Sequence, residues 1–264
     1  MSALVSRTLL ATPLLSVRDV QCAACRGRHV GAAECDAVSH IVIPYRGNFV
    51  RRVGTRIAQA DVNQALFFNA GEEYRIDHLT DEGDACLSLD VRAPMLDELA
   101  GAKRFRDSHR RIEPALQLLG AQLRRSRSNI LLAEETAVRI ARRLLTADCS
   151  ARSATAAQRR LVQRAKQMLH SDPRHRWSLS EIARTIGTSP VHLTQTFSKA
   201  EGMPLYRYQT QLRLALALHE LPETDDLASL ALNLGFSSHS QFTTAFKRMY
   251  GQSPSALKNR KAPA

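Results

Sequence analysis

The sequence lacks the short motifs by which the common enzyme classes are recognised. It contains no nucleophile elbow, no glycine-rich phosphate-binding loop and no HExxH pair of histidines. The carboxylates in the stretches GEEYRID and TDEGD fall in expected loops, where solvated charge is the usual explanation. We therefore expect a protein that is not an enzyme and that has neither catalytic residues nor a cofactor.

Long apolar runs and paired cysteines are also missing. No run approaches the roughly 18 to 20 apolar residues of a membrane span, and the stretch LLATPLLSV is interrupted by Pro13 between Arg7 and Arg18. The 5 cysteines are an odd number in a chain without a convincing export signal, which favours reduced thiols over a disulfide framework. These absences predict a cytoplasmic protein with no membrane partner.

Positive charge is concentrated in the C-terminal part of the chain. The 264 residues allow two domains of about 100 to 150 residues each. Residues 151–264 carry 16 Lys and Arg against 7 Asp and Glu, whereas residues 1–150 carry 21 against 18. A basic surface attracts phosphates without reading sequence. Charge alone leaves solubility or a membrane-facing patch as alternatives to nucleic acid.

Residues 227–250 show two short apolar stripes at helical spacing, separated by Gly235. Ser237 or Ser238 can cap the second helix, Gly251 can end it, and Pro254 bars its continuation. Two short helices with a glycine turn describe a helix-turn-helix. The first stripe consists of Leu227, Leu230, Ala231 and Leu234, and the second of Phe242, Ala245, Phe246, Met249 and Tyr250.

The same pattern occurs earlier in the chain, which strengthens the interpretation. Five residues of the earlier copy lie 48 positions before the four residues of the first stripe and Gly235. Five further residues lie 49 positions before their counterparts between residues 238 and 251. The turn of the later copy is therefore one residue longer. Residues 204–221 predict a connecting helix with Pro204 at its first position. The earlier copy consists of Leu179, Ile182, Ala183, Ile186 and Gly187, followed by Ser189, Leu193, Phe197, Ala200 and Gly202.

Residues 160–258 resemble the DNA-binding domain of AraC/XylS-type transcription regulators. The resemblance rests on LSEIARTIGTSPVHLTQTFSKAEG, on the connecting helix and on LGFSSHSQFTTAFKRMYGQSPSALK. It implies two helix-turn-helix units that read successive major-groove segments of double-stranded DNA, RNA polymerase as a partner, and activation of transcription. An architectural protein without sequence preference is the alternative, but two reading helices would be unnecessary for it.

Helical geometry predicts which side chains of the two reading helices face DNA. Gln195 can bond an adenine edge and Val191 can meet a thymine methyl group. Thr244 stands where family members often carry an arginine, so we expect the first helix to supply most base discrimination. The expected base contacts are Val191, Thr194, Gln195, His239, Ser240 and Thr244, and the expected phosphate contacts are Ser189, Lys199, Lys247 and Arg248.

The sequence pattern of the N-terminal region predicts an antiparallel β barrel or sandwich. Residues 40–54 predict two strands around a hairpin turn at Arg46-Gly47-Asn48, residues 65–78 predict two more around Asn69-Ala70-Gly71, and residues 86–91 alternate as a further strand. The family resemblance implies a cupin-like domain that binds a small-molecule effector. His40 is isolated, so the H-x-H of metal-binding cupins is absent and we expect no metal.

Five polar residues at predicted strand ends are candidates for effector binding, provided that they cluster at one mouth of the β domain. Their alternative role is that of ordinary surface turn residues. They are Tyr45, Arg46, Asn69, Glu72 and Tyr74.

Two helices, at residues 108–121 and 128–146, are expected after the strands. The second carries a broad apolar face beside Arg139, Arg142 and Arg143, which suits either packing on its own β domain or a homodimer interface. Together these features predict a two-domain α+β protein. Its parts are a cupin-like sensing or dimerisation domain at 1–147, a linker at 148–157 and an all-α DNA-binding domain at 158–264.

The cysteines raise a separate question. Cys22 and Cys25 form one C-x-x-C, followed by His29, Cys35 and His40, a combination that could bind zinc or sense oxidants. A single C-x-x-C is a weak metal signal, so we expect thiols without a metal or redox role. The rival hypothesis is a cupin-type metalloenzyme, or a metal or redox sensor, fused to a DNA-binding module.

Overall fold

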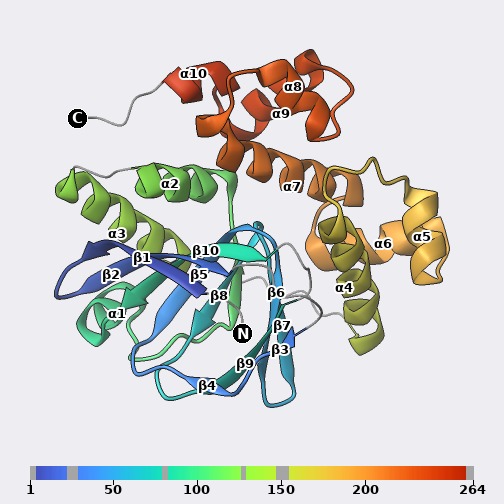
Figure 1. Ribbon diagram of the computed structural model, residues 1–264. Coiled ribbons are helices and arrows are strands. Elements are labelled where there is room, and N and C mark those ends of the chain that lie inside the picture. The colour runs from blue at the N-terminus through green and yellow to red at the C-terminus, as the bar shows by residue number, and fades with distance from the viewer. Residues whose placement is uncertain (1–3, 23–28, 79–82, 126–128, 147–154, 260–264) are drawn as a thin grey trace. The chain divides into compact units, whose positions relative to one another are not determined.

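Antiparallel strands form most of the N-terminal part of the chain and helices form the C-terminal part (Figure 1). The computed structural model describes residues 4–22, 29–78, 83–125, 129–146 and 155–259. It divides into one unit comprising Met1–Cys149 and Lys258–Ala264 and another comprising Ser150–Leu257. The predicted α+β fold class is confirmed. Within the described ranges, no helix has the length and apolar character needed to cross a membrane.

Two sheets face each other in the N-terminal unit, so the β domain is a sandwich and its barrel is not closed. The six-stranded sheet of the described residues has the order β1-β2-β10-β5-β8-β11. The second sheet has the order β3-β9-β6-β7, with β4 also paired to β9. The strands of the first sheet are β1 (Leu4–Ala11), β2 (Leu15–Cys22), β10 (Asp84–Val91), β5 (His40–Arg46), β8 (Gln64–Phe68) and β11 (His109–Arg111); those of the second are β3 (His29–Val30), β4 (Glu34–Cys35), β6 (Phe49–Val53), β7 (Arg56–Ala60) and β9 (Glu73–His78).

Both predicted hairpins are wrong, although their strands exist. The turn at residues 46–48 leads from β5 in the first sheet to β6 in the second, and the turn at 69–71 leads from β8 to β9 in the same way. The physical reason is that β5 is already paired with β10 and β8 on its two edges, and β8 with β5 and β11. No edge remains for the strand that follows. The hairpins of the domain are β1 with β2 and β6 with β7.

Alternation along the strands of the first sheet divides the core into two layers. On β5, Ile41 and Ile43 belong to a cluster that joins this sheet to the helices, whereas Val42 belongs to a cluster between the two sheets. The inter-sheet cluster adds Leu66 and Phe68 from β8, with Phe49, Ala60 and Tyr74 from the other sheet. Neighbouring residues on a strand therefore face different parts of the domain.

Three helices cover the outer face of the first sheet. The predicted helix at 108–121 is displaced, because residues 109–111 pair with β8 and the helix begins only at Pro114. Ala137, Ile140 and Ala141 of the last helix lie in the core of their own domain, while Ile130 and Leu131 are 73% and 66% exposed. The helices are α1 (Ala93–Ala100), α2 (Pro114–Arg125) and α3 (Ile130–Thr146).

The C-terminal unit consists of helices, most of which begin at a side-chain N-cap. Of the expected linker, residues 148–154 lie outside the described residues, and Thr155 is the N-cap of the first helix of this unit. Pro204 is the N-cap of the connecting helix and not its first residue. The elements are α4 (Ala156–Ser171), α5 (Leu179–Ile186), α6 (Pro190–Glu201), α7 (Leu205–Glu220), the 3-10 helix η1 (Leu221–Glu223), α8 (Leu227–Asn233), α9 (His239–Tyr250) and α10 (Pro254–Asn259).

Candidate functional site

The reading face of α6 is fixed by what the helix buries. Leu193 and Phe197 have no exposed surface, and Thr196 is buried beside them. This orientation leaves Thr194 and Gln195 exposed, together with Val191, whose side chain is 67% exposed. An exposed valine on a helix that also buries leucine and phenylalanine is available to an apolar partner such as a thymine methyl group. Ser198 is half-buried and Lys199 is exposed near the end of the helix.

Two hydroxyl groups on α6 already have backbone partners. The Ser189 Oγ accepts a hydrogen bond from the His192 N–H at 3.2 Å as the N-cap, and its own O–H can still donate to a phosphate. The Thr194 hydroxyl donates to the Pro190 carbonyl at 2.9 Å. Thr194 therefore presents its methyl group and an acceptor, so it cannot also serve as a hydroxyl donor to a base.

Helix α9 repeats this arrangement with a different set of side chains. Phe242 and Phe246 have no exposed surface, and with Tyr250 they form a row of edge-to-face ring contacts at centroid distances of 5.7 and 4.7 Å. The buried row turns the opposite face outward, where Ser240, Thr244, Lys247 and Arg248 are exposed. His239 is exposed as well, and its Nε2 lies 3.3 Å from the Thr243 hydroxyl. Of the two predicted N-cap residues, Ser237 and Ser238, the structure uses Ser238, and Gly251 ends the helix as predicted.

The two helix-turn-helix units are held together by a contact that sequence patterns did not indicate. In Figure 1, α7 runs between the α5–α6 pair and the α8–α9 pair. Arg213 on α7 donates to the carbonyls of Pro173, His175 and Gly235 at 2.8 to 3.1 Å. Arg176 also donates to the Gly235 carbonyl, at 3.1 Å. These bonds fix the loop before the first unit to the turn of the second. The sequence feature that could have indicated this contact is a charged residue, Arg213, within the apolar pattern of α7.

Acidic side chains cap the first helix of each unit. Asp226 accepts hydrogen bonds from the N–H groups of Ala228 and Ser229, and Glu181 accepts from the Ser178 N–H in a capping box. The Ser229 hydroxyl bonded to Asp226 holds the pKa of that carboxyl below its usual range, and the Ser178 N–H does the same for the pKa of Glu181. Both carboxylates are accordingly charged at neutral pH, and their negative charge near the N-terminus stabilises each helix.

The five candidate effector residues do not come together. His40 at the start of β5 pairs with Phe68, whereas Arg46 at its other end pairs with Ala85. Tyr45 and Arg46 are therefore at the opposite end of β5 from Asn69, which follows Phe68. The ring of Tyr74 contacts that of Phe68 with centroids 4.7 Å apart. Asn69, Glu72 and Tyr74 therefore lie at one end of the sandwich, and Tyr45 and Arg46 lie away from them at the other end of β5.

Tyr45 also faces the helices instead of the space between the sheets. Its hydroxyl donates to Asp19 at 2.6 Å, and the Arg124 guanidinium lies 3.7 Å from the centre of its ring. Burial, together with this bond to a carboxylate, raises the pKa of Tyr45 above its usual value. Asn69 has a structural role, because its amide exchanges hydrogen bonds with the backbone of Phe105 at 2.8 and 3.3 Å.

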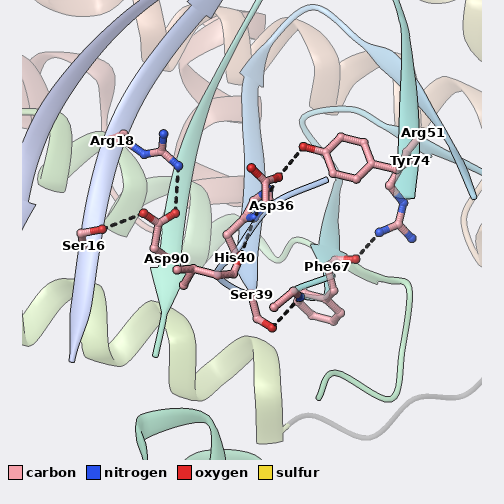
Figure 2. A network of polar contacts seen from close by, with 11 residues as sticks. Ser16, Arg18, Asp36, Ser39, His40, Arg51, Phe67, Tyr74 and Asp90 are labelled. Carbon is pink, nitrogen blue, oxygen red and sulfur yellow. Dashed lines mark hydrogen bonds and ion pairs between the residues drawn. The ribbon is translucent and has the colours of Figure 1, made fainter. Parts of the chain in front are cut away.

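Several polar side chains of the sandwich bond to one another, as Figure 2 shows. Asp36 accepts a hydrogen bond from Tyr74, and Asp90 bonds Ser16 at 2.8 Å and Arg18 at 2.9 Å. Burial lowers the pKa of His40, whose ring stacks on Phe68 at 4.6 Å. This network rigidifies one end of the sandwich.

Arg51 is the most deeply buried cation of this region. It donates to the Phe67 carbonyl and, at 3.2 Å, to the Ser108 carbonyl, and it lies over the Phe68 ring at 4.7 Å. Its Nε has no hydrogen-bond partner in the structure. A buried guanidinium with an unpaired N–H is a group that an anionic ligand could satisfy.

One cysteine has polar neighbours that sequence spacing did not predict. The Cys22 Sγ lies 3.9 Å from the Nε2 of His78, whose Nδ1 lies 2.5 Å from Asp84. Among the described residues, one ligand atom each of Cys22, His78 and Asp84 lie within 4.8 Å of one another, which is three ligands where structural zinc takes four, and Asp84 already binds the imidazole. In the described part of the chain, Cys35 is exposed and Cys86 is buried. Cys25 and Cys149 lie outside the described residues, and His40 belongs to the network of Figure 2.

Residues 182–260 match the family model described as "Helix-turn-helix domain". A "Putative AraC-like transcription regulator" of Streptomyces antibioticus is 32% identical over 39% of this chain and 34% of its own length. Another "Putative AraC-like transcription regulator", from Streptomyces lividans, is 35% identical over 36% of this chain and 31% of its own length. The "HTH-type transcriptional activator AarP" of Providencia stuartii is 38% identical over 31% of this chain and 61% of its own length.

The chain spans about a third of the length of the two Streptomyces relatives. ToxT of Vibrio cholerae, a solved structure, aligns over 96% of this chain and 100% of its own with 11% identity and a TM-score of 0.37. That value is too low to establish a common fold for the whole chain. The family match lies in the C-terminal helices, at residues 182–260.

Proposed function

We propose that this chain, whose residues 182–260 form a helix-turn-helix domain of the AraC type, is a sequence-specific DNA-binding regulator of transcription. The observation that carries the proposal is the pair of reading helices, each of which buries one apolar face and exposes short polar or basic side chains on the other. A protein that bound DNA through charge alone would not require two such ordered faces.

The two faces suit different tasks. On α6, Gln195 and Val191 can discriminate adenine and thymine, with Ser189 and Lys199 at phosphates. On α9, His239, Ser240 and Thr244 meet base edges less sharply, while Lys247 and Arg248 attract the backbone. We therefore assign most base discrimination to α6 and most anchoring to α9.

The test is binding to cognate and random DNA at matched salt. Sites selected from a randomised duplex library provide the cognate sequence, and genomic immunoprecipitation identifies the regulated promoters. We expect binding to the selected site to exceed binding to random DNA by at least about 10³-fold at physiological salt. Equal affinities for the two would exclude sequence-specific regulation and leave an architectural role.

The β sandwich is the part that we assign to sensing a small molecule. The support is the group of Asn69, Glu72 and Tyr74 near the buried, incompletely satisfied guanidinium of Arg51. Glu72→Ala should change effector-dependent transcription from a mapped promoter, while Tyr45→Phe, on the face toward the helices, should leave it unchanged. An unaltered response of Glu72→Ala would remove this end of the sandwich from consideration.

Two partners complete the proposal. RNA polymerase is the partner that activation at a promoter requires. A second copy of the chain is the other, because Ile130 and Leu131 are exposed on α3, with Val138 36% exposed two turns later. Leu131→Glu should shift sedimentation toward the monomer, whereas Glu98→Gln, at an exposed position of α1, should not. A monomeric wild-type protein at micromolar concentration would exclude this interface.

A further inference from the structure

Cys22, His78 and Asp84 meet at one end of the sandwich although they come from three strands of two sheets. Cys22 on β2 and Asp84 on β10 are direct register partners, and His78 approaches from β9 of the other sheet. The Cys22 Sγ lies 3.9 Å from the His78 Nε2, and the His78 Nδ1 lies 2.5 Å from the Asp84 carboxylate. A carboxylate therefore orients an imidazole whose second nitrogen faces a thiol.

The charge in this row favours ionisation of the sulfur. The hydrogen bond to Asp84 raises the pKa of His78 above its ordinary value and outweighs the opposing effect of burial. A protonated imidazole stabilises a neighbouring thiolate, and the thiolate is the nucleophilic form of cysteine. Asp84 acts through His78 and is a positioning residue.

We propose that Cys22 is a reactive thiolate that small hydroperoxides oxidise to a sulfenic acid. The thiolate sulfur attacks one peroxide oxygen, so that an S–O bond forms as the O–O bond breaks. The leaving hydroxide takes the Nε2 proton of His78 and departs as water, and the imidazole becomes neutral. The sulfur loses two electrons and the peroxide gains them.

The size of the oxidant follows from burial. Cys22 is 3% exposed, so a bulky reagent cannot reach the sulfur directly. The His78 side chain is 19% exposed and brings the edge of the site to solvent. A hydroperoxide not much larger than water fits this access better than an alkylating agent does.

The same domain contains two contrasting thiols. Burial raises the pKa of Cys86 well above its ordinary value, so this thiol stays protonated and inert. Cys35 is exposed and serves as the reference for an accessible thiol. If accessibility set the rate of oxidation, Cys35 would react faster than Cys22. If the Asp84–His78 pair sets it, Cys22 reacts faster than Cys35.

Peptide mapping separates these cases in the full chain. In a Cys25→Ser background the tryptic peptide of residues 19–26 has Cys22 as its only cysteine, and Cys35 and Cys86 fall in other peptides. The protein is exposed to hydrogen peroxide, quenched with catalase, denatured and alkylated, and the unalkylated fraction is followed with time. At neutral pH we expect Cys22 to be oxidised about 10-fold faster than Cys35, because an ordinary thiol is only a few per cent ionised there.

Substitutions test the role of the row. His78→Gln and Asp84→Asn should slow the oxidation of Cys22 about 10-fold or less and leave that of Cys35 unchanged. Iodoacetamide applied to the folded protein is the control, since a site that had merely opened would be alkylated faster at Cys22. Wild-type Cys22 oxidised no faster than Cys35, variants with an undiminished rate, or stoichiometric zinc released by peroxide from the purified protein would each overturn the proposal.

Discussion

The two helix-turn-helix units follow one sequence pattern but differ in what surrounds their turns. Gly187 and Gly235 both have positive φ angles, 70° and 79°. A Cβ on Gly187 would lie in open space, whereas one on Gly235 would lie 2.3 Å from the Arg174 carbonyl oxygen. The first glycine is required by its own turn only, and the second is required also by the loop packed against it. A repeated local pattern thus acquires a tertiary role in one copy.

The largest expected effect is that of replacing Gly235, and it tests directly whether the two turns differ. Gly235→Ala combines left-handed backbone strain with a backbone clash and should lower the free energy of unfolding of the C-terminal unit by more than about 3 kcal/mol. Gly187→Ala has the strain without the clash and should cost about 1 to 2 kcal/mol. Urea denaturation of the two variants measures the difference. Equal losses would show that the contact at Gly235 is dispensable.

Arg213 should matter next, because its guanidinium joins two carbonyls of the loop before the first unit to the Gly235 carbonyl in the turn of the second. Arg213→Met keeps the apolar stem and leaves the carbonyls of Pro173, His175 and Gly235 without this donor, at a cost of about 1.5 to 3 kcal/mol. Arg207→Met, at an exposed position of the same helix, is the matched control and should change stability by less than about 0.5 kcal/mol. Similar midpoints of denaturation for the two would contradict this account.

The reading faces give a comparison in binding. Gln195→Ala should weaken the cognate site by about 1 to 3 kcal/mol and relax preference at one base pair. Arg248→Ala should weaken cognate and random DNA alike and reduce the salt slope by about one unit. Titration of both variants against a randomised operator library at two salt concentrations measures these effects. A change of base preference in Arg248→Ala alone would reverse the assignment.

The smallest expected effect concerns the acidic caps. Asp226 and Glu181 have folded-state pKa values below those of the unfolded chain, so each contributes stability that is present above the unfolded pKa and lost as pH falls through the folded pKa. Carboxyl-carbon chemical shifts followed between pH 6 and pH 2 should show both groups titrating below ordinary Asp and Glu. Ser229→Ala removes the largest cause for Asp226 and should raise its pKa while leaving that of Glu181 unchanged.

The predicted helix-turn-helix domain is confirmed because its evidence is local. Leu193, Phe197, Phe242 and Phe246 recur at the helical period, so their burial follows from spacing once each helix forms. The caps at Ser189 and Ser238 act on N–H groups three residues away. Strands β5, β6, β8, β9 and β10 were visible for the same reason, whereas their partners were not. Pairing depends on which edge of a strand is already occupied.

The sequence by itself determined the helical domain, its capped reading helices and the presence of a β-rich region, since each follows from residues within a few positions of one another. Only the tertiary structure decided that β5 and β6 lie in different sheets, that Arg213 fixes the turn at Gly235, and that His78 and Asp84 stand beside Cys22. These contacts join residues 22 to 62 positions apart or depend on sheet order, and no local period in the sequence encodes them.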